Sequence, residues 1–246
     1  MFLKELHFII GKKKFKHKWQ FGKFWIIILK ILCISDKIDP QIYSPLIKER
    51  FSDVDIILSA GDLPLNYLDY IISCLNKPLF FVFGNHHTDE LKHYRKHLDF
   101  PFFPGNFDYM GCGAVHLGTK VKNENNFIVA GLGGSMRYNN GINQFTDFQM
   151  FLEISKIIPQ LLWNRIFHGR YVDALLTHAP PRGIHDKEDR CHLGFKIFLW
   201  FMKVFKPKFL VHGHIHLYDM CEQRCTKWEN TLVINAYSHF ILNSGD

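Results

Sequence analysis

The chain has 246 residues, of which 47% are hydrophobic and 22% are charged. This composition is typical of an ordinary globular protein and rules out wholesale disorder. Its 17 glycines and 10 prolines are too few for a collagen-like or low-complexity chain. The net charge of +7 comes from residues 1–30, where eight lysines accompany a single acid, and the remainder of the chain is neutral.

The start of the chain interleaves lysines with aromatic residues such as Trp19 and Trp25. This pattern has three interpretations: a solvated extension that packs partly on the domain, contact with an anionic membrane surface, or attraction of nucleic acid by the polybasic run. The most apolar run, 24–34, is shorter than the roughly 20 residues of a membrane-spanning helix. We therefore expect a cytoplasmic protein, membrane-peripheral at most, with this segment (1–28) preceding one domain (29–246). No protein partner is inferred.

From residue 30 onward, short runs rich in Ile, Val, Leu and Phe alternate with segments of helical period, the pattern of an α/β protein. The expected strands are 31–35, 55–59, 78–83, 114–117, 127–130, 174–177, 209–211 and 231–235. Helices are expected from 146 through 156 and from 193 to 205. Six phenylalanines recur there at roughly helical spacing, and such stripes usually face the core. They are Phe148, Phe151, Phe195, Phe198, Phe201 and Phe205.

Five of the expected strands end in a carboxylate, an amide or an imidazole. The side chains concerned are Asp36, Asp62, Asn85, His178, and His214 with His216. A single residue of this kind is usually a helix cap or a satisfied polar group, but open α/β sheets place their ligand sites at strand ends. Such a mixed set of oxygen and nitrogen donors suits Mn, Fe or Zn better than Mg or Ca. The sequence therefore predicts a metal centre, in which Asp62 can bridge two ions.

Taken with their neighbours, these residues resemble the signature of the calcineurin-like metallophosphoesterase superfamily. The matching blocks, in chain order, are Asp36, Gly61-Asp62, Gly84-Asn85-His86, His178 and Gly213-His214-Ile215-His216. The resemblance spans residues 36–216 and implies a four-layer α/β/β/α sandwich with two mixed β-sheets. It also implies a site for two divalent ions at the strand ends.

The resemblance implies a role for each residue of these blocks. One ion would be held by Asp62, Asn85, His178 and His214, and the other by Asp36, Asp62 and His216. His86 would stay outside the coordination shell, contact the phosphate, and protonate the leaving oxygen or stabilise its charge. A hydroxide bridging the ions would attack phosphorus in line with that oxygen. The expected reaction is hydrolysis of a phosphate ester, most readily a phosphodiester or a pyrophosphate, with monoesters also open.

Two positions depart from the family's pattern. Ile38 stands where the family has a histidine, so the site that includes Asp36 and His216 lacks one of its usual protein ligands. Asp39 could replace that ligand, water could fill the position, or the site could be weak and often empty. Alternatively, Asp39 caps a helix that begins near Pro40. His87 stands where the family has an acid.

Two further residues are candidates for substrate contact. Arg137 follows a glycine-rich stretch and suits a bidentate phosphate clamp, or it is a solvent-facing arginine on a turn. His192 contacts substrate or caps the helix expected from Leu193.

The replacement at Ile38 leaves a catalytically weak binding module as an alternative function. The basic aromatic segment leaves another, a membrane-peripheral pyrophosphatase acting on a nucleotide-linked lipid.

Overall fold

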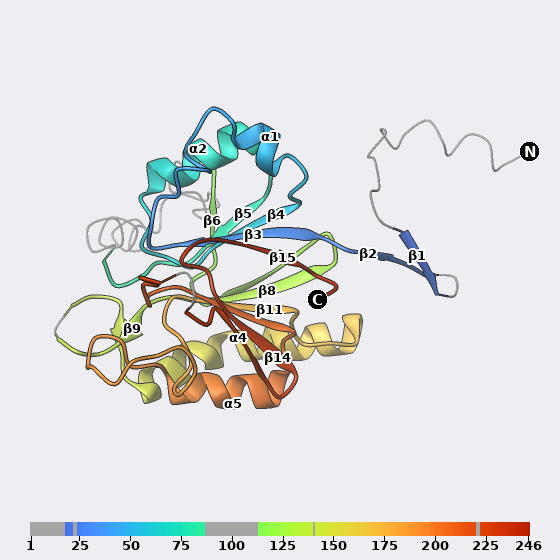
Figure 1. Ribbon diagram of the computed structural model, residues 1–246. Coiled ribbons are helices and arrows are strands. Elements are labelled where there is room, and N and C mark those ends of the chain that lie inside the picture. The colour runs from blue at the N-terminus through green and yellow to red at the C-terminus, as the bar shows by residue number, and fades with distance from the viewer. Residues whose placement is uncertain (1–17, 22–23, 87–112, 140, 220–221) are drawn as a thin grey trace, which may run out of the picture.

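The computed structural model describes the chain in five stretches: 18–21, 24–86, 113–139, 141–219 and 222–246. Residues 1–17, most of the predicted basic segment, lie outside this part, as does His87. Within it, two β-sheets stack face to face and helices cover both outer faces (Figure 1). This confirms the expected four-layer α/β/β/α sandwich. The division of the chain at residue 28 stays a prediction.

The described helices are α1 (Ile47–Phe51), α2 (Leu65–Leu75), α4 (Asp147–His168) and α5 (Lys196–Phe205). The first sheet has the strand order β15 (Ser238–Asn243), β3 (Lys30–Ser35), β4 (Ile56–Ser59), β5 (Leu79–Phe81) and β6 (Val115–His116). The second has the order β13 (Cys225–Trp228), β14 (Thr231–Asn235), β12 (Phe209–His212), β11 (Ala174–Thr177), β8 (Phe127–Leu132) and β7 (Lys120–Glu124). Two short pairs are β1 (Lys18–Phe21) with β2 (Phe24–Ile27), and β9 (Ser135–Met136) with β10 (Gln144–Phe145).

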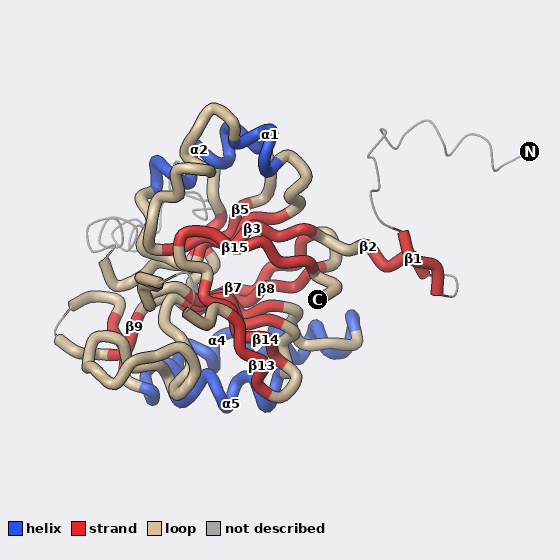
Figure 2. Tube along the Cα trace, in the orientation of Figure 1, coloured by secondary structure: helices blue, strands red, loops and turns tan. Residues whose placement is uncertain are grey.

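Both sheets are parallel in the middle and antiparallel at an edge. In the first sheet, β15 runs antiparallel to β3, and the other strands are parallel to their neighbours. In the second, β7 and β13 are the antiparallel edges of a parallel centre. Because parallel strands end on one side, the loops that follow them gather at one edge of the sandwich (Figure 2).

Alternate residues of each strand enter different layers of the core, as the two-residue period of a strand requires. Ile31 and Cys33 of β3 face the second sheet, whereas Leu32 packs under α1 and α2. In β11, Leu176 faces the first sheet and Leu175 packs against α4 and α5. Strands that are buried on both faces read as continuous apolar runs, which explains why these strands were recognisable in the sequence.

The helix α4 extends beyond the predicted end at residue 156 and reaches His168. Thr146 and Gln149 form a capping box, in which each side chain accepts a hydrogen bond from the other residue's backbone N–H. Gly169 ends the helix with a φ of 72°, in the left-handed conformation. The helix passes through Pro159, so the proline does not end it. No described helix is long and apolar enough to cross a membrane.

Several details differ from the sequence expectations. The helix expected from Leu193 begins at Lys196, and the chain after Pro40 forms a turn instead of a helix. Four of the six phenylalanines are buried as expected, but Phe148 is 67% exposed and Phe151 is 36% exposed. The prediction that these two face the core is wrong, because α4 buries its opposite side against the second sheet.

Candidate metal centre

The predicted ligands follow strands of both sheets and meet at the shared edge. Asp36 follows β3 directly, His178 follows β11, and His214 lies just beyond β12. The backbone N–H of His214 donates to Asp36 Oδ2 over 2.9 Å, and the Nδ1–H of His178 donates to the carbonyl of Ala60 over 2.8 Å. These two bonds join the loop ends of one sheet to those of the other, so the centre is assembled between the sheets.

The backbone turns sharply where three of these side chains leave their strands. Asp36, Asp62 and His214 adopt positive φ angles of 60°, 54° and 68°, and Gly61 adopts 100°. A residue other than glycine in this region costs about 1–3 kcal/mol and is typical of functional sites. The hydrogen bonds between the loops maintain these strained backbone conformations. The conformations point the side chains toward one another instead of along the sheet.

Three glycines leave room for the ligands. A Cβ on Gly61 would lie 2.7 Å from Nδ1 of His178, a Cβ on Gly84 would collide with the carboxylate of Asp62, and one on Gly213 would collide with that of Asp36. These glycines are the ones that stand next to the ligands in the sequence. Their small size, as well as their backbone freedom, is therefore what the centre requires.

Three donor groups converge on one point. Side-chain ligand atoms of Asp62, His178 and His214 all lie within 4.8 Å of one another. Nε2 of His178 lies 3.2 Å from Asp62 Oδ2 and 3.0 Å from Asn85 Oδ1. Because Nδ1 of His178 donates to a backbone carbonyl, Nε2 is the nitrogen left for a metal, the usual arrangement of a ligating histidine. The residues therefore fit a divalent ion here.

The charges of the two buried imidazoles differ. Burial opposes the charged form of His178, but the nearby Asp62 carboxylate raises its pKa to about 9. Burial lowers the pKa of His214 to about 3. In the protein alone, His178 therefore carries a positive charge at the place where a cation would sit, and it would release that proton on binding the metal.

A second buried carboxylate, Asp36, lies beside this donor group. The side chain of Asp36 is 1% exposed, and its Oδ1 has no hydrogen-bond partner among the described residues. Nε2 of His216 lies 3.9 Å from this oxygen. Burial raises the pKa of Asp36, and so does the neighbouring Asp62 carboxylate. A buried carboxylate oxygen is normally paired with a hydrogen-bond donor or an ion. A cation shared with His216 would be such a partner for Asp36 Oδ1.

The structure does not bring Asp39 into this group. Its Oδ2 accepts hydrogen bonds from Ser238 Oγ and His239 Nδ1, both over 2.6 Å, and its Oδ1 accepts the backbone N–H of Gln41 over 2.7 Å. These bonds hold the pKa of Asp39 below its usual value although burial opposes them. Asp39 thus tethers the turn after β3 to β15 instead of capping a helix. Ile38 is 42% exposed.

The remaining predicted residues lie near the centre but outside its donor set. His86 is exposed, and its backbone N–H donates to Asp62 Oδ1 over 3.1 Å. The ring of His192 lies 5.3 Å from that of His214, and its Nδ1 pairs with Asp189 at 2.8 Å. His192 precedes α5 without capping it, since the N-cap residue of α5 is Phe195.

Arg137 and its neighbour Tyr138 follow β9, the short strand after the glycine-rich end of β8. Arg137 is exposed and donates to the carbonyl of Gln144 over 3.5 Å. Tyr138 was not predicted, but its hydroxyl accepts a hydrogen bond from Asn85 Nδ2 over 3.1 Å. This bond presents Asn85 Oδ1 to the centre. No local sequence pattern indicates this hydrogen bond, because 53 residues separate the two partners.

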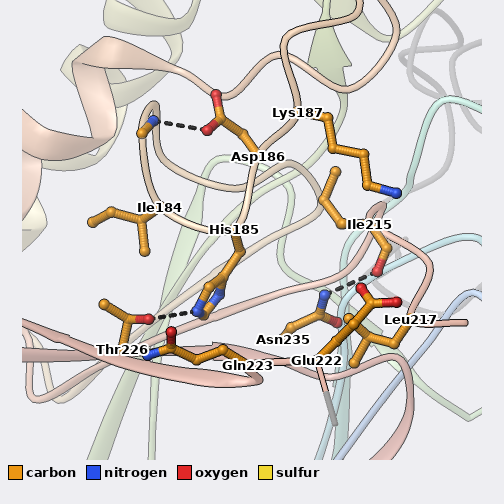
Figure 3. A pocket seen from close by; sticks show the side chains of 11 residues that line it. Ile184, His185, Asp186, Lys187, Ile215, Leu217, Glu222, Gln223, Thr226 and Asn235 are labelled. Carbon is orange, nitrogen blue, oxygen red and sulfur yellow. Dashed lines mark hydrogen bonds between the residues drawn. The ribbon is translucent and has the colours of Figure 1, made fainter. Parts of the chain in front are cut away.

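A chain of hydrogen bonds supports the loop that carries His214. His212 Nδ1–H donates to the carbonyl of Gly213 over 2.9 Å, so its Nε2 accepts from His185 Nδ1–H, also over 2.9 Å. The Nε2 of His185 then accepts from the Thr226 hydroxyl over 2.8 Å, the bond that Figure 3 draws. Burial lowers the pKa of His212 to about 3 and that of His185 to about 4, so both rings are neutral.

His185 and Thr226 also line a cavity of about 440 Å³. The side chains of Lys187 and Glu222 and the loop residue Ile215 line it as well (Figure 3). Because Ile215 stands between two predicted ligands, this cavity adjoins the metal centre from the side of the supporting loop.

Comparisons with known proteins place the chain in a family. A family model of calcineurin-like phosphoesterases matches residues 29–218. A comparison with curated proteins finds no match. Among solved structures, one crystal structure has a TM-score of 0.61 at 14% identity and covers 88% of this chain and 95% of its own. Thermus thermophilus SoxB, a sulfate thiohydrolase solved with glycerol, has a TM-score of 0.39 at 11% identity, covering 78% of this chain and 36% of its own.

The fold and the donor set thus define a metal-dependent hydrolase. The family match covers most of the chain, and the likeness to the first solved structure shows the same fold. The chain belongs to the calcineurin-like phosphoesterase family and is a metallophosphoesterase.

Proposed function

We propose that the protein hydrolyses phosphodiester or pyrophosphate bonds and that its two divalent ions are Mn, Fe or Zn. The observation that carries this proposal is the pairing of a convergent donor group with a second buried carboxylate. Asp62, His178 and His214 converge within 4.8 Å, and Asp36 Oδ1, beside His216, has no hydrogen-bond partner in the part of the chain that the structure describes. One ion would be held by the first group with Asn85, and the other by Asp36, Asp62 and His216.

The bound ions would supply Lewis-acid activation of water and neutralise charge on the phosphate. The chain's own residues would bind and orient the substrate. His86 is exposed beside Asp62, so its imidazole can give a proton to the leaving oxygen. Arg137 has a guanidinium suited to two phosphate oxygens, and His192 is held by Asp189 near His214.

The preference for a substituted phosphate rests on the openness of the centre. His86 is exposed, and the side chain of His216 is 47% exposed, so the described residues leave space for a group on each side of the phosphate. A phosphomonoester would need no such space.

The test is turnover of bis(p-nitrophenyl) phosphate by the full chain with Mn²⁺, compared with p-nitrophenyl phosphate as the monoester. His86→Ala is assayed at equal metal content and is expected to lose roughly 10²–10⁴ in rate, the usual contribution of a positioned proton donor. His168→Ala, at the far end of α4, serves as the control and should match the parent.

Faster turnover of the diester than of the monoester would support the proposal. No turnover of either substrate by the metal-loaded parent would instead favour the binding-module alternative. Loss of bound metal in His86→Ala would show that this residue is a ligand and would remove its assignment as proton donor.

A further inference from the structure

The helix α4 is apolar on two opposite sides. Its inner side buries Met150, Ile154, Ile157 and Leu161 against the second sheet. Its outer side exposes a second row of large apolar side chains. These include Phe148, Phe151, Leu162, Trp163, Ile166 and Phe167.

This outer row runs along the whole helix. The row consists of Phe148, Leu152, Pro159, Trp163 and Ile166. Each of them stands three, four or seven residues after the one before it, so they lie on one side of the helix. Ile166 is 74% exposed and Trp163 is 56% exposed. The outer side of a surface helix is normally polar, and a cluster of exposed large apolar side chains, here interrupted by Ser155, marks an interaction site.

Helix α5 extends this surface. Its Trp200 and Val204 are 37% and 42% exposed, and the ring of Trp200 packs edge-on against that of Phe151 at 5.9 Å. We call the outer sides of the two helices, which lie together on one outer layer (Figure 1), the α4–α5 face.

The charges on the two helices are mainly positive. They carry four basic residues, Lys156, Arg165, Lys196 and Lys203, and two acids. Both acids are engaged: Asp147 accepts the backbone N–H of Ile197, and Glu153 pairs with Lys156. Lys196 and Lys203 are exposed and stand four and three residues from Trp200 on α5, so two positive charges flank the apolar surface there.

We propose that the α4–α5 face docks on an anionic lipid membrane. Phenylalanine, tryptophan and isoleucine beside lysine and arginine are the composition of helices that lie in the membrane interface, and basic side chains are attracted to anionic lipid headgroups. A second copy of the chain would bring Lys196 and Lys203 against a face of like charge, which opposes self-association. The docked helices would lie parallel to the membrane plane, with the opposite layer of α1 and α2 in water.

The experiment is co-sedimentation of the full chain with vesicles of phosphatidylcholine alone or mixed with phosphatidylglycerol. The parent should bind the anionic vesicles and bind less as salt is raised. The double variant Leu162→Gln with Ile166→Gln should lower the partition coefficient at least about tenfold, since two large apolar side chains no longer enter the interface. Both side chains are exposed, at 50% and 74%, so the fold should persist.

A matched control is Tyr43→Gln with Leu46→Gln. These residues are 53% and 44% exposed on the opposite outer layer, and their variant should sediment like the parent. A second variant, Lys196→Glu with Lys203→Glu, should lose binding to anionic vesicles while keeping its thermal melt. This charge reversal tests the same face without removing any apolar side chain.

Three results would overturn the proposal. The first is a parent that does not bind anionic vesicles. The second is equal binding by the parent and the Leu162/Ile166 variant, which would place the contact elsewhere, as in the basic segment 1–28. The third is a concentration-dependent dimer that the variant abolishes without any vesicle binding, because the face would then be an interface between copies.

Discussion

Asp36 shows how one side chain serves both the fold and the chemistry. Its Oδ2 accepts the backbone N–H of His214 and so anchors the loop that carries two ligands. Its Oδ1 is buried without a hydrogen bond among the described residues, and an unsatisfied buried acceptor costs about 1–3 kcal/mol, more when it is charged. A bound cation would offset this cost, so the same residue positions the centre and gains from filling it.

Ile38→His tests whether the departure from the family's pattern weakens the proposed site that includes Asp36 and His216. Ile38 is 42% exposed, so an imidazole fits without disturbing the core. We expect the variant to bind the less tightly held of the two Mn²⁺ ions about tenfold more tightly, a gain of roughly 1.4 kcal/mol in binding free energy. A calorimetric titration measures this affinity. Leu46→His, at the similarly exposed N-cap position of α1, is the control. No gain in Ile38→His would mean that its position does not face the ion.

His185→Gln tests the neutral hydrogen-bond chain through pH. Burial lowers the pKa of His185 from 6.5 to about 4, so the unfolded chain takes up the proton first as the pH falls. The free energy of unfolding should therefore decrease between about pH 6.5 and pH 4. This decrease should be shallower in His185→Gln, measured by urea unfolding with a chelator present. His168→Gln, at an exposed position, should follow the parent; an equal slope in all three proteins would contradict the role of His185.

At the level of secondary-structure elements, the strand ends decide where the donors lie. Each ligand follows a strand whose two faces are buried, and a glycine lies beside the ligand in three of the turns. The edge strands β7, β13 and β15 escaped prediction because they lack such continuous apolar runs. The donor-bearing strands are therefore also the ones that the sequence reveals best.

Gly84→Ala tests the close approach of backbone and ligand. A methyl group there would collide with the Asp62 carboxylate and lie 2.7 Å from His178, so one or both ligands must move. We expect Mn²⁺ affinity to fall at least about tenfold, in the range of changes seen when the support of a ligand is disturbed. Equilibrium dialysis with metal analysis measures this loss.

The control for this variant is Gly169→Ala at the end of α4. Gly169 has a positive φ of 72°, but a Cβ there meets nothing within 4 Å. The control should lose about 1 kcal/mol of stability through backbone strain and bind Mn²⁺ like the parent. If Gly84→Ala also bound metal like the parent, the steric account of the centre would be wrong.

For the whole molecule, the centre lies between two sheets that contribute different donors. Asp36 and Asp62 come from the first sheet, and His178 and His214 come from the second. Elsewhere the sheets meet through an apolar core. A metal ion would therefore link the two halves of the sandwich at their loop edge.

Metal binding should raise the melting temperature of the full chain. At a Mn²⁺ concentration 100 times the Kd, the native state gains about 2.7 kcal/mol, which corresponds to roughly 5–10 °C for a chain of this size. Asp62→Asn should show a much smaller rise, because the shared carboxylate loses its charge. The surface variant Asp53→Asn, in a position paired with Lys30, should behave like the parent. A rise of equal size in Asp62→Asn would show that the metal binds elsewhere.

The sequence by itself determined the α/β class of the fold and the chain order of the donor residues, whereas the four-layer sandwich was implied by the family resemblance. The sequence could do so because doubly buried strands appear as apolar runs and because each donor stands at a strand end. The family resemblance carried by those residues agreed with the fold and the family match. These features are local in the chain, so periodicity and spacing are enough to predict them.

Only the tertiary structure decided what the remaining polar and aromatic side chains do. Asp39 accepts a hydrogen bond from Ser238, which is 199 residues away, and Tyr138 orients Asn85. No local sequence pattern indicates either partner. The period of α4 predicts an apolar side but not which of two apolar sides is buried. The second sheet covers one of them and leaves Phe148 and Trp163 exposed, because burial depends on which surface the other elements occupy.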